Sequence, residues 1–425
     1  MTEIKKYRWL MFFILGAIYF LACLHRTAPT VIARDLMQAF QADAALLGLI
    51  ASAYFFLYSA VQPPVGILSD TIGPRKVVVI FTIISAAGCI IFSTASTVNG
   101  AVVGRALIGA GVGGIFIPSL KIFSRWYHAD EFAGITGIML AIGSIGGIAA
   151  TLPLTYLVLF FGWRISFAVI GALALLCAMI CWLIIKDRPE EKNWPSIEAE
   201  TLQEATEDTP EITMPLFERL SIIFTNSKFW MVTIASFFAG STFLTFQGLW
   251  AVPYLTDVFS LSRAKAGGLL MLLPLGFSIG AVSFGPLTTK LGLNRNRFLL
   301  NSVIICILCW IILLLFKGQE SYLFIIPLFL IMGICVGGIL PILMTTVKEL
   351  FPLELTGTAV GLMNPAAFLG TAIFQPFTGF LLDRSGVLES GAYTPGAYKS
   401  IFVVFLISFI LTYLCSYLVF RKGTA

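Results

Sequence analysis

Apolar stretches of about 20 residues, long enough to cross a bilayer as helices, recur along the whole chain. Of the 425 residues, 58% are hydrophobic and 12% are charged. Soluble domains carry roughly a quarter charged residues, so a water-soluble globular fold is excluded. The sequence therefore predicts an all-α polytopic membrane protein.

The apolar stretches predict twelve membrane-spanning helices. Their approximate ranges are 9–36, 44–69, 76–97, 99–123, 131–157, 163–185, 229–256, 263–289, 297–316, 321–347, 355–382 and 397–420. Charged residues precede a full-length first span, so we expect a retained helix at the start and not a removed signal peptide.

The basic residues are divided unevenly between the two sides of the predicted membrane. Most of the 27 Lys and Arg residues fall in the two terminal segments and in the loops on the same side. The positive-inside rule therefore places both termini in the cytoplasm. The formal net charge of +5 is too small and too dispersed to suggest nucleic-acid binding.

One long polar segment, from Lys186 to about Lys228, separates spans six and seven. Its acidic residues and prolines predict a solvated linker, and residues 217–224 suit a short amphipathic helix in the membrane interface. We therefore expect an N-terminal six-helix bundle (1–186), a cytoplasmic linker (187–228) and a C-terminal six-helix bundle (229–425).

The two halves echo each other in sequence. The glycine-rich segment 111–118 of span four is similar to segment 335–341 of span ten. Two six-helix repeats joined by a linker are typical of transporters that hold their substrate near the bilayer midplane.

The segment from Gly66 to Lys76, at the cytoplasmic end of span two, resembles the loop signature G-x-x-x-D-x-x-G-[RP]-R-[RK] of the major facilitator superfamily. Together with the twelve spans and the central linker, this resemblance covers the whole chain. It implies rocking between inward-open and outward-open states, with spans 1, 4, 7 and 10 lining the cavity. It also supports a cytoplasmic latch between the bundles formed by Asp70, Gly73 and Arg75.

Span one carries a finer resemblance. Residues 25–29, followed by 35–40, resemble the start of facilitators for organic anions, including sugar acids, and of bacterial transporters for amino acids and nucleosides. Span five lacks the Gly-Pro dipeptide that is typical of drug/proton antiporters, which favours a solute transporter over a drug exporter.

Two arginines inside predicted spans are the main candidates for substrate binding. Arg26 lies near the middle of span one, and Arg105 lies in the outer half of span four. A guanidinium is costly in hydrocarbon and normally faces a cavity or a partner. No carboxylate lies deep in a predicted span, so both are natural receptors for a carboxylate or phosphate. The alternative for Arg105 is a brace that binds backbone carbonyls.

His25 is the one histidine within a predicted span. Because an imidazole titrates near neutrality, His25 is a candidate for the coupling proton. The alternative is a histidine hydrogen-bonded inside the bundle. His25 and Arg26 are successive residues, so they cannot share one helix face.

Three polar and aromatic faces are further candidates for substrate contacts, since binding sites combine apolar walls with a few polar groups. The alternative is helix packing through interhelical hydrogen bonds. The three faces are Tyr54, Tyr58 and Gln62 on span two; Gln247, Trp250 and Tyr254 on span seven; and Asn364, Phe368 and Gln375 on span eleven.

Other apparent signals carry no chemistry. Residues 109–114 fit G-x-G-x-x-G, but they lie inside a span, so close helix packing explains them better than a dinucleotide site. The eight cysteines fall in apolar spans and suit small buried hydrophobes, not metal ligands. We expect no cofactor, no metal and no catalytic residue.

These features together predict a non-enzymatic secondary transporter of a bacterial inner membrane. It would move a small carboxylate-bearing solute (an organic anion, an amino acid or a short peptide) by alternating access. We expect uptake, proton symport as the coupling mode and function as a monomer. The alternatives are a drug or metabolite exporter working as a proton antiporter, and a non-transporting membrane receptor or scaffold.

Overall fold

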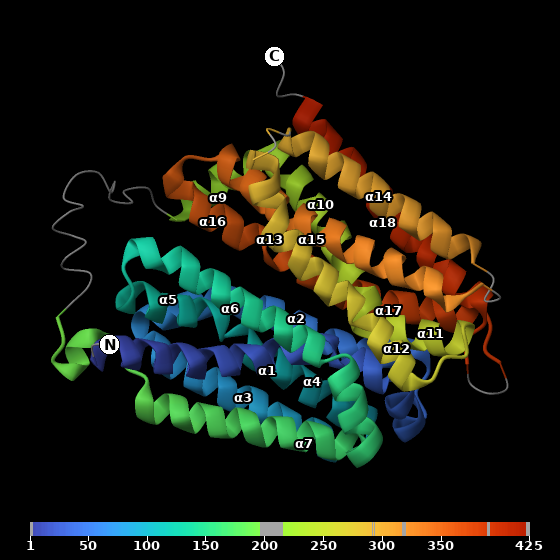
Figure 1. The fold of residues 1–425 in the computed structure, drawn as a ribbon, viewed down its shortest axis with the longest axis horizontal. Coiled ribbons are helices and arrows are strands. Elements are labelled where there is room, and N and C mark those ends of the chain that lie inside the picture. Colours follow the sequence, from blue (N-terminus) through green and yellow to red (C-terminus); the bar gives the residue numbers. More distant parts are fainter. Residues whose placement is uncertain are drawn as a thin grey trace. The chain divides into compact units, whose positions relative to one another are not determined.

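A computed structural model describes residues 3–195, 216–290, 292, 294–316, 320–388 and 392–421. The middle of the predicted linker, 196–215, lies outside the described residues. The described chain consists of helices, with one isolated antiparallel bridge between Val387 and Tyr393 (Figure 1). The predicted all-α fold is confirmed.

In the first half the helices are α1 (Glu3–Phe40), α2 (Ala44–Thr71), α3 (Pro74–Thr94), α4 (Val98–Gly113), α5 (Phe116–Trp126), α6 (Ala129–Ala149), α7 (Leu152–Ile184) and the 3-10 turn η1 (Pro189–Lys192). From the end of the linker onward they are α9 (Leu216–Thr225), α10 (Ser227–Thr245), the π turn η2 (Phe246–Trp250), α11 (Ala251–Val258), α12 (Arg263–Leu270), α13 (Leu272–Lys290), α14 (Arg295–Leu315), the 3-10 turn η3 (Tyr322–Phe324), α15 (Ile325–Leu350), α16 (Leu353–Met363), α17 (Pro365–Arg384) and α18 (Pro395–Arg421).

Eleven helical segments of the described chain are long and apolar enough to cross a membrane. A shorter apolar helix, Gly134–Ala149, lies where the fifth span is predicted. The structure is therefore consistent with twelve spans. Below, the outer end of a span is the end that the basic residues predict to face away from the cytoplasm, and the inner end is the opposite one.

Predicted spans four, five, seven, eight and eleven are interrupted, and in the first three a proline follows the interruption by four residues. Span four breaks at Gly114, span five breaks after Ala149, and span seven forms its π turn around Leu249. The prolines are Pro118, Pro153 and Pro253. A proline has no N–H to donate to the carbonyl four residues earlier, so the regular helix is lost at that point.

By contacts between backbones, the chain forms two compact units. The N-terminal unit contains residues 1–26, 53–150 and 157–211. The C-terminal unit contains 27–52, 151–156 and 212–425. The outer ends of α1 and α2 thus cluster with the second half of the chain, whereas the expected bundles divide at the linker.

Glycines bring helices together in the same way in both units. A Cβ added to Gly109 on α4 would collide with the Tyr54 carbonyl on α2. A Cβ added to Gly337 on α15 would collide with the Phe277 carbonyl on α13. Spans two and four therefore pack as spans eight and ten do, and helix packing accounts for Gly109 in the G-x-G-x-x-G segment.

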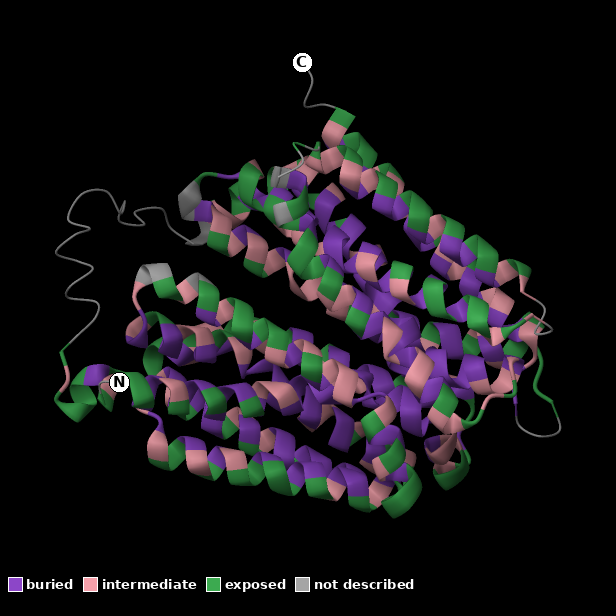
Figure 2. Cartoon of the chain, in the orientation of Figure 1, coloured by how far each residue is buried: buried purple, intermediate pink, exposed green. Residues whose placement is uncertain are grey.

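Large apolar side chains stay exposed along the outer surfaces of the helices, as α7 illustrates with Phe160, Leu173 and Leu183 (Figure 2). On a chain with these long apolar helices, such faces suit contact with lipid tails.

Gly109→Ala should destabilise the N-terminal unit, because α2 and α4 must separate to admit the new methyl group. Overpacking of this kind typically costs about 1–3 kcal/mol. The measurement is the melting temperature of the detergent-purified protein. Gly66→Ala, with nothing within 4 Å of its added Cβ, is the control and should melt at or above the wild-type temperature. Equal melting of both variants would contradict the close approach of α2 and α4.

Candidate functional site

Arg26 lies partly buried on α1, among aromatic side chains of α2. Its guanidinium carbon is 5.8 Å from the centroid of the Tyr58 ring. The Tyr58 hydroxyl interacts with the side chains of Arg26 and Gln62. Tyr54 stacks on Tyr58, with ring centroids 6.0 Å apart. The structure thus brings four of the predicted site residues together as one arginine–tyrosine patch: Arg26, Tyr54, Tyr58 and Gln62.

Phenols and a thiol surround the Arg26 guanidinium. The titratable side chains that act on it most strongly are Cys23, Tyr58, Tyr54 and Tyr19. These groups are neutral at pH 7, so they solvate the guanidinium without cancelling its charge. A ligand carboxylate would meet a positive charge on a partly exposed side chain.

Arg105 is more enclosed, with 1% of its surface exposed. Its Nη1 donates to the backbone carbonyl of His25 at 3.3 Å, and its guanidinium carbon lies 4.7 Å from the centroid of the Tyr54 ring. Its Nε and Nη2 have no hydrogen-bond partner in the described part of the chain. Arg105 therefore ties α4 to α1 and α2, in the geometry that a brace requires.

His25 points into the interior of the N-terminal unit, with 1% of its surface exposed. Its Nε2 lies 3.4 Å from the Cys89 thiol of α3, and its ring centroid is 6.0 Å from that of Phe167 on α7. Its Nδ1 has no hydrogen-bond partner among the described residues. The imidazole is thus a buried titratable group next to the patch that holds Arg26.

The residues predicted to share a face of span seven lie in and after the π turn and have different partners. The Gln247 Nε2 donates to the Thr27 hydroxyl at 3.1 Å, while its Oε1 has no partner among the described residues. Trp250 is fully buried and donates to the Thr378 hydroxyl at 2.8 Å. Tyr254 packs against Tyr398 and other rings. The π turn adds a residue to one turn of the helix, so the spacing of a regular helix no longer applies.

The predicted residues of span eleven lie on both sides of a helix break. Asn364 is partly buried between α16 and α17, and Phe368 follows on α17 with similar exposure. Gln375 is fully buried, and neither atom of its amide has a hydrogen-bond partner in the described chain. Such an amide retains unused capacity to bind a polar group.

An ion pair with a buried carboxylate joins the outer ends of α1 and α11. Asp257 has a side chain that is 3% exposed and forms an ion pair with Arg34. It also accepts hydrogen bonds from the Tyr393 N–H at 3.0 Å and the Tyr398 hydroxyl at 2.9 Å. A buried carboxylate needs several hydrogen-bond or ion-pair partners to offset the loss of water, and Asp257 has them.

The outer end of α2 is held in the same unit. The Asp383 carboxylate of α17 accepts the Ala44 and Ala45 N–H groups at 3.0 and 2.8 Å, so it caps the N-terminus of α2. It also accepts the Tyr393 hydroxyl at 2.7 Å. Burial and this hydrogen bond raise the pKa of the Tyr393 phenol, which therefore stays protonated and continues to donate.

A two-pronged ion pair completes these contacts. Arg263 at the start of α12 donates to both oxygens of Asp35 on α1, at 2.8 and 3.2 Å. We call the contacts made by Asp35, Asp257 and Asp383 the outer acidic contacts. The sequence prediction missed these residues; the available signal was the placement of acids at the outer ends of spans 1, 7 and 11.

The residues of the loop signature make their contacts within the N-terminal unit. Asp70 forms an ion pair with Lys121 of α5. Gly73 has φ +93°, a conformation that favours glycine. The Asp187 carboxylate accepts the Arg75 N–H at 2.7 Å. The predicted role of these residues as a latch between bundles remains a prediction.

Curated transporters are similar to this chain over nearly its whole length. The chain is 25% identical to the hexuronate transporter of Escherichia coli (strain K12) over 395 residues, which cover 91% of this chain and 90% of that protein. It is 26% identical to the probable sulfoacetate transporter SauU of Cupriavidus necator, with 95% of each chain covered.

Solved transporter structures share the fold. A bacterial homolog of the human lysosomal transporter Spinster, in an inward-facing and unoccupied conformation, matches with a TM-score of 0.78, 21% identity and 99% of each chain covered. A D-xylose–proton symporter matches with a TM-score of 0.75, 14% identity and 98% of each chain covered.

The family model for the Major Facilitator Superfamily matches residues 11–374. This match covers most of the chain and agrees with the loop signature at Gly66 to Lys76. The chain belongs to the Major Facilitator Superfamily of membrane transporters.

Proposed function

We propose that this transporter moves a small carboxylate-bearing solute by alternating access and that Arg26 holds the anionic group. The observation that carries the proposal is the position of Arg26, a partly exposed arginine near the middle of a predicted span, with its guanidinium among neutral phenols. A guanidinium binds a carboxylate through two parallel hydrogen bonds, and this interaction strengthens where water is excluded.

Arg105 is assigned a supporting role in this proposal. Its 1% exposure and its bond to the His25 carbonyl suit a residue that fixes α1 and α2 around Arg26. In this proposal Arg105 adds positive charge to the arginine–tyrosine patch, while Arg26 makes the direct contact with the ligand carboxylate.

The second half of the chain is proposed to bind the uncharged part of the solute. The Oε1 of Gln247 and the amide of Gln375, which have no hydrogen-bond partner among the described residues, are polar groups there with unused capacity. Asn364 and Phe368 add a partly exposed amide and ring. Trp250, whose N–H is taken by Thr378, supports the wall of the site by packing.

The names of the relatives support an acidic solute. A hexuronate carries a carboxylate on a sugar, and sulfoacetate carries a carboxylate and a sulfonate. Uptake by a monomer, with a proton carried by His25, completes the proposal. The competing function is export of drugs or metabolites, which accumulation of apolar cations outside proteoliposomes would favour.

In this proposal, one set of contacts controls access to the site from the outer side and another set controls access from the inner side. The outer acidic contacts are proposed to hold the outer side closed and to break when that side opens. Asp70, Gly73 and Arg75 are proposed to act as the latch at the inner side. Both assignments assume that contacts at one end of the spans are made in one state and broken in the other.

Arg26→Ala should abolish binding of galacturonate, used here as a hexuronate probe, and Arg26→Lys should weaken it strongly. Lysine keeps the charge but loses the planar fork. Loss of a buried charged hydrogen bond costs about 2–5 kcal/mol, or roughly thirtyfold to several-thousandfold in affinity. The measurements are calorimetric titration and ligand-induced thermal shift, with galactose as the uncharged control.

Arg105→Lys, compared with Arg26→Ala in the same thermal-shift assay, distinguishes a residue that stabilises the helix packing from one that binds the ligand. It should lower the melting temperature without ligand, whereas Arg26→Ala should melt near the wild-type temperature and gain no stability from ligand. Full ligand stabilisation of well-folded Arg26→Ala would remove Arg26 from the site, and the acidic substrate class with it.

His25→Gln should remove the pH dependence of uptake into proteoliposomes while leaving substrate exchange largely intact. Glutamine replaces the imidazole with a group that does not titrate. Cys89 and Arg105 face the imidazole from α3 and α4, so Cys89→Ser serves as the control for changed packing. An unchanged pH dependence in folded His25→Gln would exclude His25 as the proton carrier.

Asp383→Asn should favour the outward-open state, because the neutral amide caps α2 more weakly. Hydrogen bonds to charged groups contribute about 1.5–3 kcal/mol, or roughly 10- to 150-fold in the equilibrium. The measurement is labelling of Thr30→Cys by a membrane-impermeant maleimide, in a background without reactive native cysteines. Thr30 is fully buried and bonds the Val252 N–H, so labelling requires opening.

Asp43→Asn is the matched control for this experiment. Asp43, the residue before α2, accepts the Leu46 N–H, which is a hydrogen bond within the same helix end. It should leave labelling at the wild-type level. Equal labelling rates in both variants would mean that Asp383 stabilises a helix end without controlling the outer side.

A further inference from the structure

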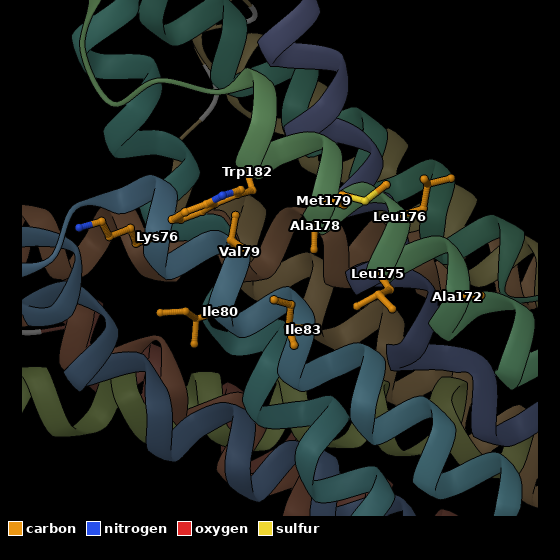
Figure 3. A pocket seen from close by; sticks show the side chains of 10 residues that line it. All are labelled: Lys76, Val79, Ile80, Ile83, Ala172, Leu175, Leu176, Ala178, Met179 and Trp182. Atoms are coloured by element: carbon orange, nitrogen blue, oxygen red, sulfur yellow. The ribbon is translucent and has the colours of Figure 1, made fainter. Parts of the chain in front are cut away.

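A long apolar groove runs between α3 and α7 on the surface of the N-terminal unit, with a cavity volume of about 810 Å³ (Figure 3). Val79, Ile80 and Ile83 line it from α3, and Leu175, Met179 and Trp182 line it from α7. Its volume lies within the range of pockets that hold small organic ligands. The exposure of Ile80, Ile83 and Met179 places this groove on the surface that suits contact with lipid tails.

The groove is bounded by packing at both ends. Toward the outer side, a Cβ added to Gly171 of α7 would lie 2.8 Å from the Cβ of Cys89 on α3, so the helices touch there. Toward the inner side, the Arg75 side chain donates to the Ile185 carbonyl at 3.1 Å and joins the helices again. The groove therefore lies between two contacts, and its lining covers about two turns of α3 (76–83) and about three turns of α7 (172–182).

A lysine lines the inner end of the groove. Lys76 is the one charged residue among the described residues that line it, and its side chain is exposed and forms no ion pair within the described chain. Arg75 does not compete for a ligand at this end, because its guanidinium packs 4.9 Å from the centroid of the Trp182 ring. Tryptophan and lysine at this depth are typical of the boundary between lipid tails and headgroups.

We propose that this groove binds one anionic phospholipid of the leaflet predicted to be cytoplasmic. The acyl chain lies along α3 and α7, and the phosphate meets Lys76. Anionic lipids of that leaflet attract basic residues at the membrane surface. The apolar lining of the groove complements the acyl chain of such a lipid, and Lys76 at its inner end complements the phosphate. This binding site is independent of the transported solute, so the proposed substrate and this lipid can fail separately.

The test measures lipid binding to the delipidated full chain by native mass spectrometry. Phosphatidylglycerol and phosphatidylcholine with identical acyl chains are titrated in parallel. We expect one saturable site that prefers phosphatidylglycerol. Lys76→Gln should remove the preference between the two lipids, whereas Lys6→Gln, at an exposed lysine of α1 that does not line the groove, should retain it.

Filling the groove tests the acyl chain. Ala172→Trp places an indole in the groove and should weaken binding of both lipids, whereas Leu173→Trp, whose exposed side chain lies outside the groove lining, should not. Met179→Trp fills the middle of the groove and replaces Ala172→Trp if that variant melts early. Glycerol 3-phosphate, which has the phosphate but no acyl chain, should not displace the lipid.

Three results would overturn the proposal. Equal headgroup preference in Lys76→Gln and Lys6→Gln would remove Lys76 from the site. Equal lipid binding in the groove-filling variants and Leu173→Trp would show that the lipid lies elsewhere. Displacement by glycerol 3-phosphate would indicate a site for a free anion.

Discussion

Close approach of helix backbones at glycine is the constraint on which the packing of this transporter depends. Inside hydrocarbon, helices gain little from burying apolar side chains against each other, so tight van der Waals contact must hold them together. Gly109 against Tyr54 and Gly337 against Phe277 provide that contact at corresponding crossings of the two halves. The Gly109 crossing also fixes Tyr54 of α2 next to Arg105 of α4. The geometry of the arginine–tyrosine patch therefore follows from a residue that has no side chain.

Charge is distributed in opposite ways in the two compact units. In the N-terminal unit, Arg26 and Arg105 lie among phenols, thiols and carbonyls, so the interior is positive. In the C-terminal unit, Asp257 and Asp383 accept several donors each at the outer ends of spans. An electropositive interior suits an anionic solute, and compensated acids suit contacts that are made and released.

Local sequence patterns predicted the features that depend on local physics. Span positions follow from hydropathy, and Arg26 stands out because a guanidinium in hydrocarbon is costly. The predicted face of Gln247, Trp250 and Tyr254 assumed a regular helix, and the π turn at Phe246–Trp250 removed that regularity. Pro253, four residues after Leu249, was the signal for it. The ion pair of Arg34 and Asp257 joins residues 223 positions apart, and helix periodicity carries no information about such a pairing.

Tyr393 links the two places where the first spans are fastened to the second half of the chain. Its N–H binds Asp257, the partner of Arg34 on α1, and its hydroxyl binds Asp383, which caps α2. If Tyr393 moves with one of these two carboxylates, the other carboxylate, Asp257 or Asp383, loses a hydrogen-bond donor. The attachments of the outer ends of α1 and α2 are thereby coupled through one residue, because both carboxylates that hold them share Tyr393 as a donor.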